Sequence, residues 1–147
     1  MNNTISNILN SSEGLDTLAL RVGAGVIFTA HGAQKLFGWF GGFGLEGTAG
    51  WMESIGLAPG YLLALMAGSA EFFGGLALIL GVLVRPSAVV LAFTMLVAIF
   101  AVHFENGLFM ANNGYEFALA LLVISVGLAI RGAGSLSFDR MIAEKLA

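Results

Sequence analysis

Two ionisable side chains inside apolar stretches of the chain have the clearest potential for chemistry. Glu71 lies near the middle of the apolar stretch 61–85, and His31 lies in the earlier apolar stretch 15–37. An ionisable group in hydrocarbon is costly unless it is paired, so such a residue is a functional candidate by default. Histidine and a carboxylate can together hydrogen-bond a ligand and transfer protons. We therefore interpret His31 and Glu71 as the catalytic pair of a buried site; the alternative is a carboxylate that only locks two helices together.

The rise of an α-helix places further polar groups near the same depth. At about 1.5 Å per residue, His31 lies roughly 22 Å and Glu71 roughly 21 Å from the membrane boundary nearest the termini. The same count brings titratable groups from four apolar segments into one layer. The candidate binding residues in or beside this layer are Gln34, Lys35, His103, Tyr115 and Glu116.

Several chemistries fit such a layer. In the first, His and Tyr side chains hydrogen-bond the ring oxygens of a quinone while Glu71 or Glu116 moves protons. In the second, two histidines and two carboxylates hold a metal ion. In the third, His31 and His103 are the axial ligands of haem b. We favour the quinone, assign no metal ligands, and keep open a purely structural layer of hydrogen-bonded side chains.

The composition is that of an integral membrane protein. Only 10% of the 147 residues are charged and the mean hydropathy is +0.91, whereas a soluble domain carries about 25% charged residues. The net charge of −3 and the lack of a basic run exclude nucleic acid as a partner. The chain has no Cys, which excludes disulfides, thiolate nucleophiles and iron–sulfur clusters carried by this chain.

The apolar pattern predicts an all-α fold, a transmembrane bundle of four helices. The predicted spans form one domain, residues 15–134, and cover about 15–37, 61–84, 87–104 and 115–130. A polar tail, 1–14, precedes this domain and an amphipathic tail, 135–147, follows it. The first extracytoplasmic loop is expected to contain a short amphipathic segment: either a helix from Thr48 to Gly56 capped by Thr48, or an irregular loop anchored by Trp39 and Trp51 at headgroup level. Arg85 and Pro86 are expected to form the tight turn between the second and third spans, because proline cannot continue a helix without losing a backbone hydrogen bond, although it starts one well.

The Lys and Arg residues predict an orientation. The side that holds both termini carries most of them: Arg85, Arg131, Arg140 and Lys145. Such an excess marks the cytoplasmic side, so both termini are predicted to be cytoplasmic. Arg21, near that side, is expected to extend toward lipid phosphate. The small-residue pair Ala70 and Gly74 keeps a homo-oligomer among the expected states.

Several segments of the chain resemble the DoxX family. They are RVGAGVIFTAHGAQKLFGWFGG, GSAEFFGGLALILGVLVRP, VHFENGLF, NGYEFALALL and GAGSLSFDR, and the resemblance extends from about Leu20 to Arg140. It implies a small four-span protein of the bacterial inner membrane. Family members are often labelled oxidoreductases; the name is shared with subunits of a thiosulfate:quinone oxidoreductase, and relatives are associated with quinone, catechol, sulfur or oxidative stress. The resemblance supplies no catalytic residues.

Residues and resemblance together lead to one leading hypothesis. The chain is expected to be an inner-membrane oxidoreductase, or the membrane subunit of one, that binds a quinone-like molecule between its helices. Its expected surroundings are the lipid bilayer and a partner oxidoreductase subunit. The rival hypotheses are a non-enzymatic membrane scaffold or stress-related partner protein, and a small-molecule carrier.

Overall fold

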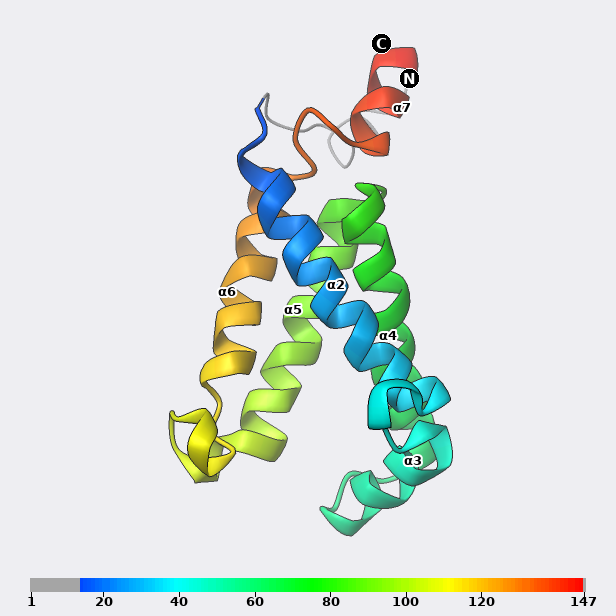
Figure 1. Ribbon diagram of the computed structural model, residues 1–147, viewed down its shortest axis with the longest axis vertical. Helices are drawn as coiled ribbons and strands as arrows, with labels where there is room; N and C mark the ends of the chain where they lie inside the picture. Colours follow the sequence, from blue (N-terminus) through cyan, green and yellow to red (C-terminus); the bar gives the residue numbers. More distant parts are fainter. Residues whose placement is uncertain (1–13, 147) are drawn as a thin grey trace.

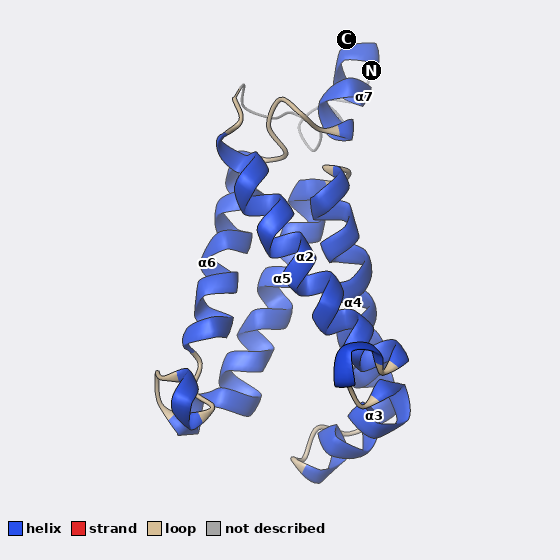
Figure 2. Cartoon of the chain, in the orientation of Figure 1, coloured by secondary structure: helices blue, strands red, loops and turns tan. Residues whose placement is uncertain are grey.

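The computed structural model describes residues 14–146, so nearly all of the predicted N-terminal tail lies outside the described residues. The described chain forms six α-helices with short 3₁₀ and π-helical turns and no strand (Figures 1 and 2), which confirms the all-α class. The four longest run in alternating directions: α2 (Asp16–Phe37), α4 (Gly60–Leu80), α5 (Val84–Ala98) and α6 (Glu116–Arg131). Both ends of the described chain therefore lie at one end of the bundle, the terminal end; the opposite end is the loop end.

Two helical stretches are long and apolar enough to cross a membrane. One is α4, and the other is the continuous stretch Val84–Asn106, which comprises α5, the π-helical turn η2 (Ile99–His103) and the 3₁₀ turn η3 (Phe104–Asn106). Neither α2 nor α6 is among them, and α6 has only 16 residues. The structure thus supports two of the four predicted spans.

Glycine residues let α2 and α4 approach closely. A Cβ atom on Gly32 would lie 2.3 Å from the backbone nitrogen of Phe72, and one on Gly75 would lie 2.6 Å from the backbone nitrogen of Thr29. Only glycine fits at contacts this short. As a result α2 and α4 form one tightly packed pair, while α6 packs mainly on α5. The two pairs diverge toward the loop end (Figure 1).

The turn between α4 and α5 lies earlier in the chain than predicted. Gly81 ends α4 in the left-handed conformation, with φ 71°, where glycine is favoured. The next helix begins at Val84, so Arg85 and Pro86 lie in its first turn. The predicted turn at these two residues was wrong because proline is tolerated in a first helical turn, where its missing N–H has no intrahelical partner to lose.

A buried arginine holds the terminal end of the bundle together. Arg21 on α2 is 2% exposed. Its guanidinium donates to the backbone oxygens of Ala133 at 3.0 Å, Leu78 at 3.0 Å and Ile79 at 2.8 Å, and also to that of Leu136. The predicted extension toward lipid phosphate is therefore wrong, because carbonyls of α4 and of the segment after α6 satisfy the guanidinium inside the protein.

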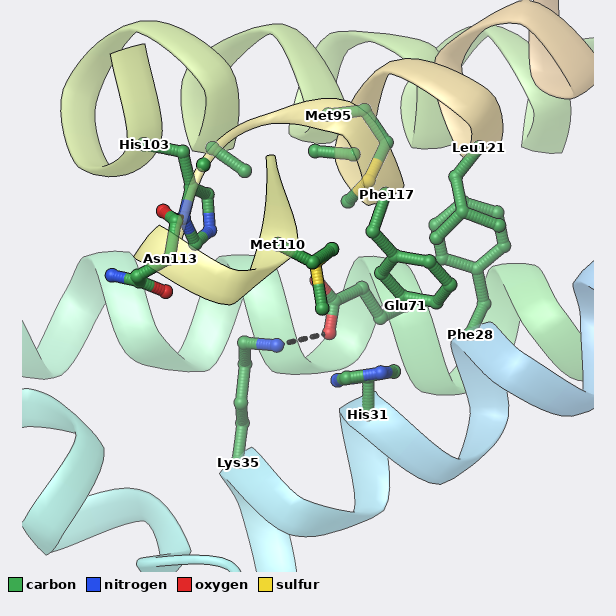
Figure 3. Close-up of a pocket in the computed structure, with 13 residues that line it drawn as sticks. Phe28, His31, Lys35, Glu71, Met95, His103, Met110, Asn113, Phe117 and Leu121 are labelled. Carbon is green, nitrogen blue, oxygen red and sulfur yellow. Dashed lines mark hydrogen bonds and ion pairs between the residues drawn. The ribbon is translucent and has the colours of Figure 1, made fainter. Parts of the chain in front are cut away.

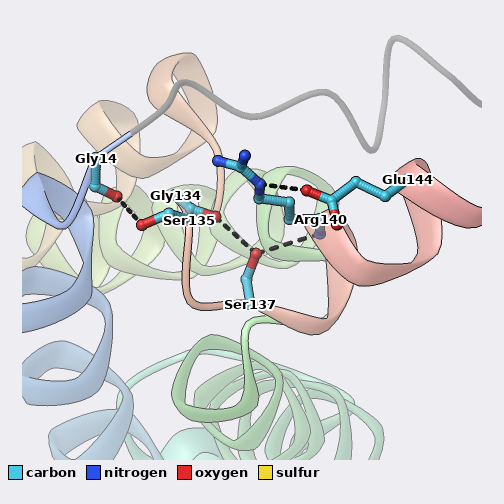
Figure 4. A network of polar contacts seen from close by, with 6 residues as sticks. All are labelled: Gly14, Gly134, Ser135, Ser137, Arg140 and Glu144. Atoms are coloured by element: carbon cyan, nitrogen blue, oxygen red, sulfur yellow. Dashed lines mark hydrogen bonds and ion pairs between the residues drawn. The ribbon is translucent and has the colours of Figure 1, made fainter.

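The segment after α6 folds back over the terminal end. The Ser135 N–H donates to the Gly14 oxygen at 2.9 Å. The Ser137 hydroxyl donates to the Gly134 oxygen at 2.8 Å and accepts the Arg140 N–H at 3.2 Å (Figure 4). These hydrogen bonds hold the segment that connects α6 to the last helix in place.

That last helix, α7 (Phe138–Leu146), is anchored through a buried carboxylate. Asp139 is 1% exposed, and its two oxygens accept the N–H groups of Leu83 at 2.6 Å and Val84 at 2.9 Å. These N–H groups stand at the start of α5, where an intrahelical partner is lacking. Asp139 thus caps the start of α5, and the same two hydrogen bonds attach α7 to the bundle.

Short helices and exposed aromatic residues make up the loop end. The 3₁₀ turn η1 (Trp39–Gly41) and α3 (Gly44–Ser54) follow α2, and η4 (Met110–Asn112) precedes α6. The helix expected from Thr48 to Gly56 exists, but it spans Gly44–Ser54. Thr48 lies inside it, 5% exposed, and its hydroxyl donates to a carbonyl of α2 at 3.5 Å instead of capping α3.

Candidate functional site

A cavity of about 210 Å³ lies between the two helix pairs, toward the loop end (Figure 3). Four ionisable side chains line it: His31 and Lys35 from α2, Glu71 from α4 and His103 from η2. The rest of the wall is mainly apolar and includes Phe28, Met95, Met110, Phe117 and Leu121. All four long helices or their continuations therefore contribute to one small, largely apolar space.

The shortest polar contact in this cavity joins Lys35 and Glu71. The Lys35 Nζ lies 2.5 Å from the Glu71 Oε2, and the two side chains are 25% and 5% exposed. Within residues 14–146 the Oε1 atom accepts no hydrogen bond. Lys35 is thus the immediate partner of Glu71, and His31 reaches the carboxylate only across the cavity that they share.

His31 presents its ring to the same cavity. In the described part of the chain, neither ring nitrogen makes a hydrogen bond. The ring packs against that of Phe117 on α6, with centroids 5.9 Å apart and an interplanar angle of 45°. A neutral imidazole has one donor and one acceptor nitrogen, so His31 can bind an oxygen atom or pass a proton.

His103 reaches the cavity through a change in helical winding. Residues Ile99–His103 form a π-helical turn at the end of α5, and such turns redirect the side chains that follow them and are frequent at functional sites. The His103 Nδ1 lies 2.9 Å from the backbone oxygen of Asn113. A carbonyl only accepts, so Nδ1 carries the proton and the neutral ring presents Nε2 as an acceptor.

Three of the predicted binding residues do not line this cavity. Gln34 donates to a carbonyl of η1 at 3.3 Å and faces a separate pocket at the loop end. Tyr115 stacks on Phe104, with centroids 5.8 Å apart. Glu116 accepts the Met110 N–H at 2.7 Å and so holds η4 in place. Depth along a helix does not define which way a side chain points, and the sequence supplied only the depth.

The apolar wall of the cavity was not predicted. A spacing signal exists for part of it: Phe28 lies three residues before His31, and Phe117 lies four residues before Leu121, so each pair shares a helix face. Met110, which lies outside the long helices, carries no such signal. Which apolar face lines a cavity and which is packed shut depends on the helix packing.

The metal-based alternatives gain no support from this geometry. Among the described residues, no three of the His, Asp and Glu side chains come close enough together to hold a metal ion. The cavity, at about 210 Å³, is also smaller than the roughly 300–1,000 Å³ typical of sites for drug-sized ligands, and haem exceeds those ligands in size. A single aromatic ring is a better match, since a cavity of about 150 Å³ holds benzene.

Fold and site together define an all-helical protein with two candidate membrane-spanning stretches and a partly open cavity lined by ionisable side chains. The DoxX family model matches residues 17–104, a range that includes the four ionisable residues of the cavity. The chain belongs to the DoxX family.

Relatives from two bacteria are similar to this chain along most of its length. "Putative oxidoreductase CatD" of Bacillus subtilis (strain 168) is 35% identical over 134 residues, which cover 91% of this chain and 92% of the relative. "Inner membrane protein YqjF" of Escherichia coli (strain K12) is 36% identical over 138 residues, which cover 90% of this chain and 96% of the relative. No solved structure matches this chain.

Proposed function

We propose that this protein is an oxidoreductase of the bacterial inner membrane, or the membrane subunit of one, and that it binds a quinone-like ring in the cavity. One observation carries the proposal: four ionisable side chains converge on a small apolar space. In a purely structural layer the polar atoms satisfy one another. Within the described chain, however, both nitrogens of His31 and one oxygen of Glu71 are left for a ligand.

The proposed roles follow from the available atoms. His31 hydrogen-bonds one ring oxygen, and Glu71 exchanges a proton with the ring as its oxidation state changes. Lys35 holds the Glu71 carboxylate and stabilises negative charge on a ring oxygen. His103, with Nε2 as an acceptor, binds a hydroxyl of the reduced ring. Interconversion of quinone and hydroquinone moves two electrons and two protons, and the electrons pass to or from a partner oxidoreductase subunit.

The names of the relatives agree with this proposal. The Bacillus subtilis relative is named an oxidoreductase and the Escherichia coli relative an inner membrane protein. The cavity volume of about 210 Å³ favours a one-ring head group over a larger ring system.

We further propose four membrane spans, formed by α2, α4, α6 and the stretch Val84–Asn106, with both termini in the cytoplasm. Large apolar side chains point away from the bundle on α5 and α6: Val89, Phe93, Val123 and Ile130 are 58%, 66%, 63% and 68% exposed. Such a surface is unfavourable in water but matches lipid tails. The exposed Trp39 and Trp51 at the loop end suit a headgroup layer, and the Lys and Arg excess lies at the terminal end.

Ligand binding by purified protein tests the proposed site. The probe is 2,3-dimethoxy-5-methyl-1,4-benzoquinone, titrated calorimetrically into the protein in detergent. We expect binding by the wild type, loss of binding in His31→Phe and weaker binding in Glu71→Gln. The matched control is Glu46→Gln, the same carboxylate-to-amide change at an exposed position on α3 outside the cavity lining. Unchanged binding in both cavity variants would place the ligand elsewhere and refute the proposed site.

The rival functions give different results. A scaffold binds no quinone although it folds normally. A carrier binds the ring and moves it across vesicle membranes, but its turnover involves no change in the oxidation state of the ring. A quinol-coupled assay beside a vesicle flux assay separates these cases. A reporter fused after Ala147 tests the orientation and is expected to behave as a cytoplasmic fusion.

A further inference from the structure

The cavity is closed toward the terminal end by apolar packing. Phe28 and Leu121 form its wall on that side and are 1% and 4% exposed. The next layer consists mainly of buried apolar side chains, such as Leu78 and Leu128, and the buried hydroxyl of Ser125 makes no hydrogen bond with described residues. Arg21 lies seven residues before Phe28, about 10 Å along α2, and its guanidinium is occupied by four carbonyls. Water therefore has no continuous polar route from the terminal end to the cavity.

The wall toward the loop end is different in kind. Met110 and Asn113 line the cavity and are themselves exposed on the outside, Met110 by 52%. In Figure 3, His103 lies beside Asn113, in line with the 2.9 Å contact between the His103 Nδ1 and the Asn113 oxygen. This part of the cavity is therefore partly open to the surroundings.

Lys35 connects the cavity with a second hollow at the loop end. A pocket of about 240 Å³ is formed by Lys35 together with residues of α2, η1 and α3, among them Gln34, Thr48 and Trp51. Among residues 14–146, Lys35 alone lines both spaces. Its flexible four-carbon stem lets the ammonium group move between partners, and a quarter of its side chain is already exposed.

We propose that water and protons reach the cavity only from the loop end, and that Lys35 controls this route. With its ammonium on Glu71, the Lys35 side chain separates the cavity from the outer pocket. When the ammonium turns toward the outer pocket, Glu71 and His31 gain contact with water on that side. This inference deepens the proposed function, because it assigns the side of the membrane with which the site exchanges its protons. With the proposed orientation, that side is extracytoplasmic.

The natural absence of cysteine allows a direct test with single-cysteine variants. A118C introduces a thiol at a buried position, 5% exposed, on the cavity wall. A88C places one in the closed apolar core, at 0% exposure. E46C on α3 and E144C on α7 report on the loop side and the terminal side. Each is treated with a charged, membrane-impermeant methanethiosulfonate in right-side-out and in inside-out vesicles.

The expected result is one-sided labelling. A118C reacts only in the vesicles in which E46C reacts, and from the other side it stays at the background set by A88C. Its rate rises several-fold when Lys35→Ala is added, because the separating side chain is then truncated. M95C, also on the cavity wall, replaces A118C if that variant fails to fold.

Contrary results are equally clear. Labelling of A118C from the E144C side, from both sides, or from neither side overturns the one-sided route. A rate that Lys35→Ala leaves unchanged overturns the role of Lys35. None of these readouts needs a quinone. If the function proposed above is wrong, quinone binding is absent while one-sided labelling persists; if only this inference is wrong, binding persists and the labelling pattern changes.

Discussion

Removing the charge of Glu71 tests whether its pair with Lys35 holds the protein together or serves the site. Breaking a fully buried ion pair costs about 3–5 kcal/mol, whereas an exposed pair contributes about 0–1 kcal/mol. This pair lies between those limits, because Glu71 is 5% and Lys35 25% exposed. In Glu71→Gln the remaining cation can turn toward the outer pocket and water. We therefore expect a loss of about 2 kcal/mol in the free energy of unfolding.

The reverse change is expected to cost more. Lys35→Met leaves the carboxylate, which has little access to water, without its partner, and we expect a loss of about 3 kcal/mol. The double variant has neither charge and is expected to be more stable than Lys35→Met alone, since replacing both members of a buried pair is often nearly neutral. Reversible unfolding in mixed detergent micelles measures all three differences as a double-mutant cycle.

Two results would refute this reasoning. If the two single changes add within about 0.5 kcal/mol in the double variant, the 2.5 Å contact contributes no coupling energy. If Glu71→Gln lowers stability but leaves quinone-dependent turnover per folded molecule unchanged, Glu71 is a structural residue and the proposed proton exchange is wrong. Glu46→Gln, the exposed control on α3, should change neither quantity.

Three further predictions concern packing and capping, each measured by unfolding in the same micelles. Gly32→Ala forces a Cβ against the backbone of Phe72 and should cost about 1–3 kcal/mol, whereas Gly23→Ala meets nothing within 4 Å and should gain about 0.5–1 kcal/mol; equal effects would contradict the α2–α4 contact. Asp139→Ala removes the cap of α5 and should cost about 0.5–2 kcal/mol. Ser125→Ala removes a buried hydroxyl that makes no hydrogen bond with described residues, so a loss above about 1 kcal/mol would contradict its isolation.

Much of the fold follows from patterns that depend on neighbours in the sequence. The apolar stretches predict the long helices, but the end of α4 at Gly81 was not predicted, because a glycine inside an apolar stretch is compatible with a continuing helix. The role of Arg21 did not follow, since its acceptors lie 57 to 115 residues away along the chain. A sequence window shows that an arginine is near a helix end, but it does not show which distant carbonyls meet there.

The candidate site was predictable in depth but only partly in direction. A fixed rise per residue places His31 and Glu71 at one level, and the structure puts both on one cavity. Tyr115 and Glu116 have a suitable depth, yet they stand at the start of α6, where the preceding loop engages them. For His103, the π-helical turn changes the helix face, and no feature of a single sequence window specifies that turn.

Two of the buried charged residues in the described chain, Arg21 and Glu71, differ in a way that bears on function. Arg21 and Glu71 are about equally inaccessible, at 2% and 4% exposure. The guanidinium of Arg21 has four backbone carbonyls as acceptors, so its hydrogen bonds are made within the protein. One oxygen of Glu71 accepts a hydrogen bond from Lys35. The His31 imidazole lines the same cavity and makes no hydrogen bond within residues 14–146. The remaining polar atoms of Glu71 and His31 border the cavity and are not among the fully buried side-chain atoms that lack a partner, so they are available to hydrogen-bond a ligand that enters it. At the terminal end the polar atoms of Arg21 are therefore committed to the fold, whereas the cavity toward the loop end still offers polar atoms to a ligand.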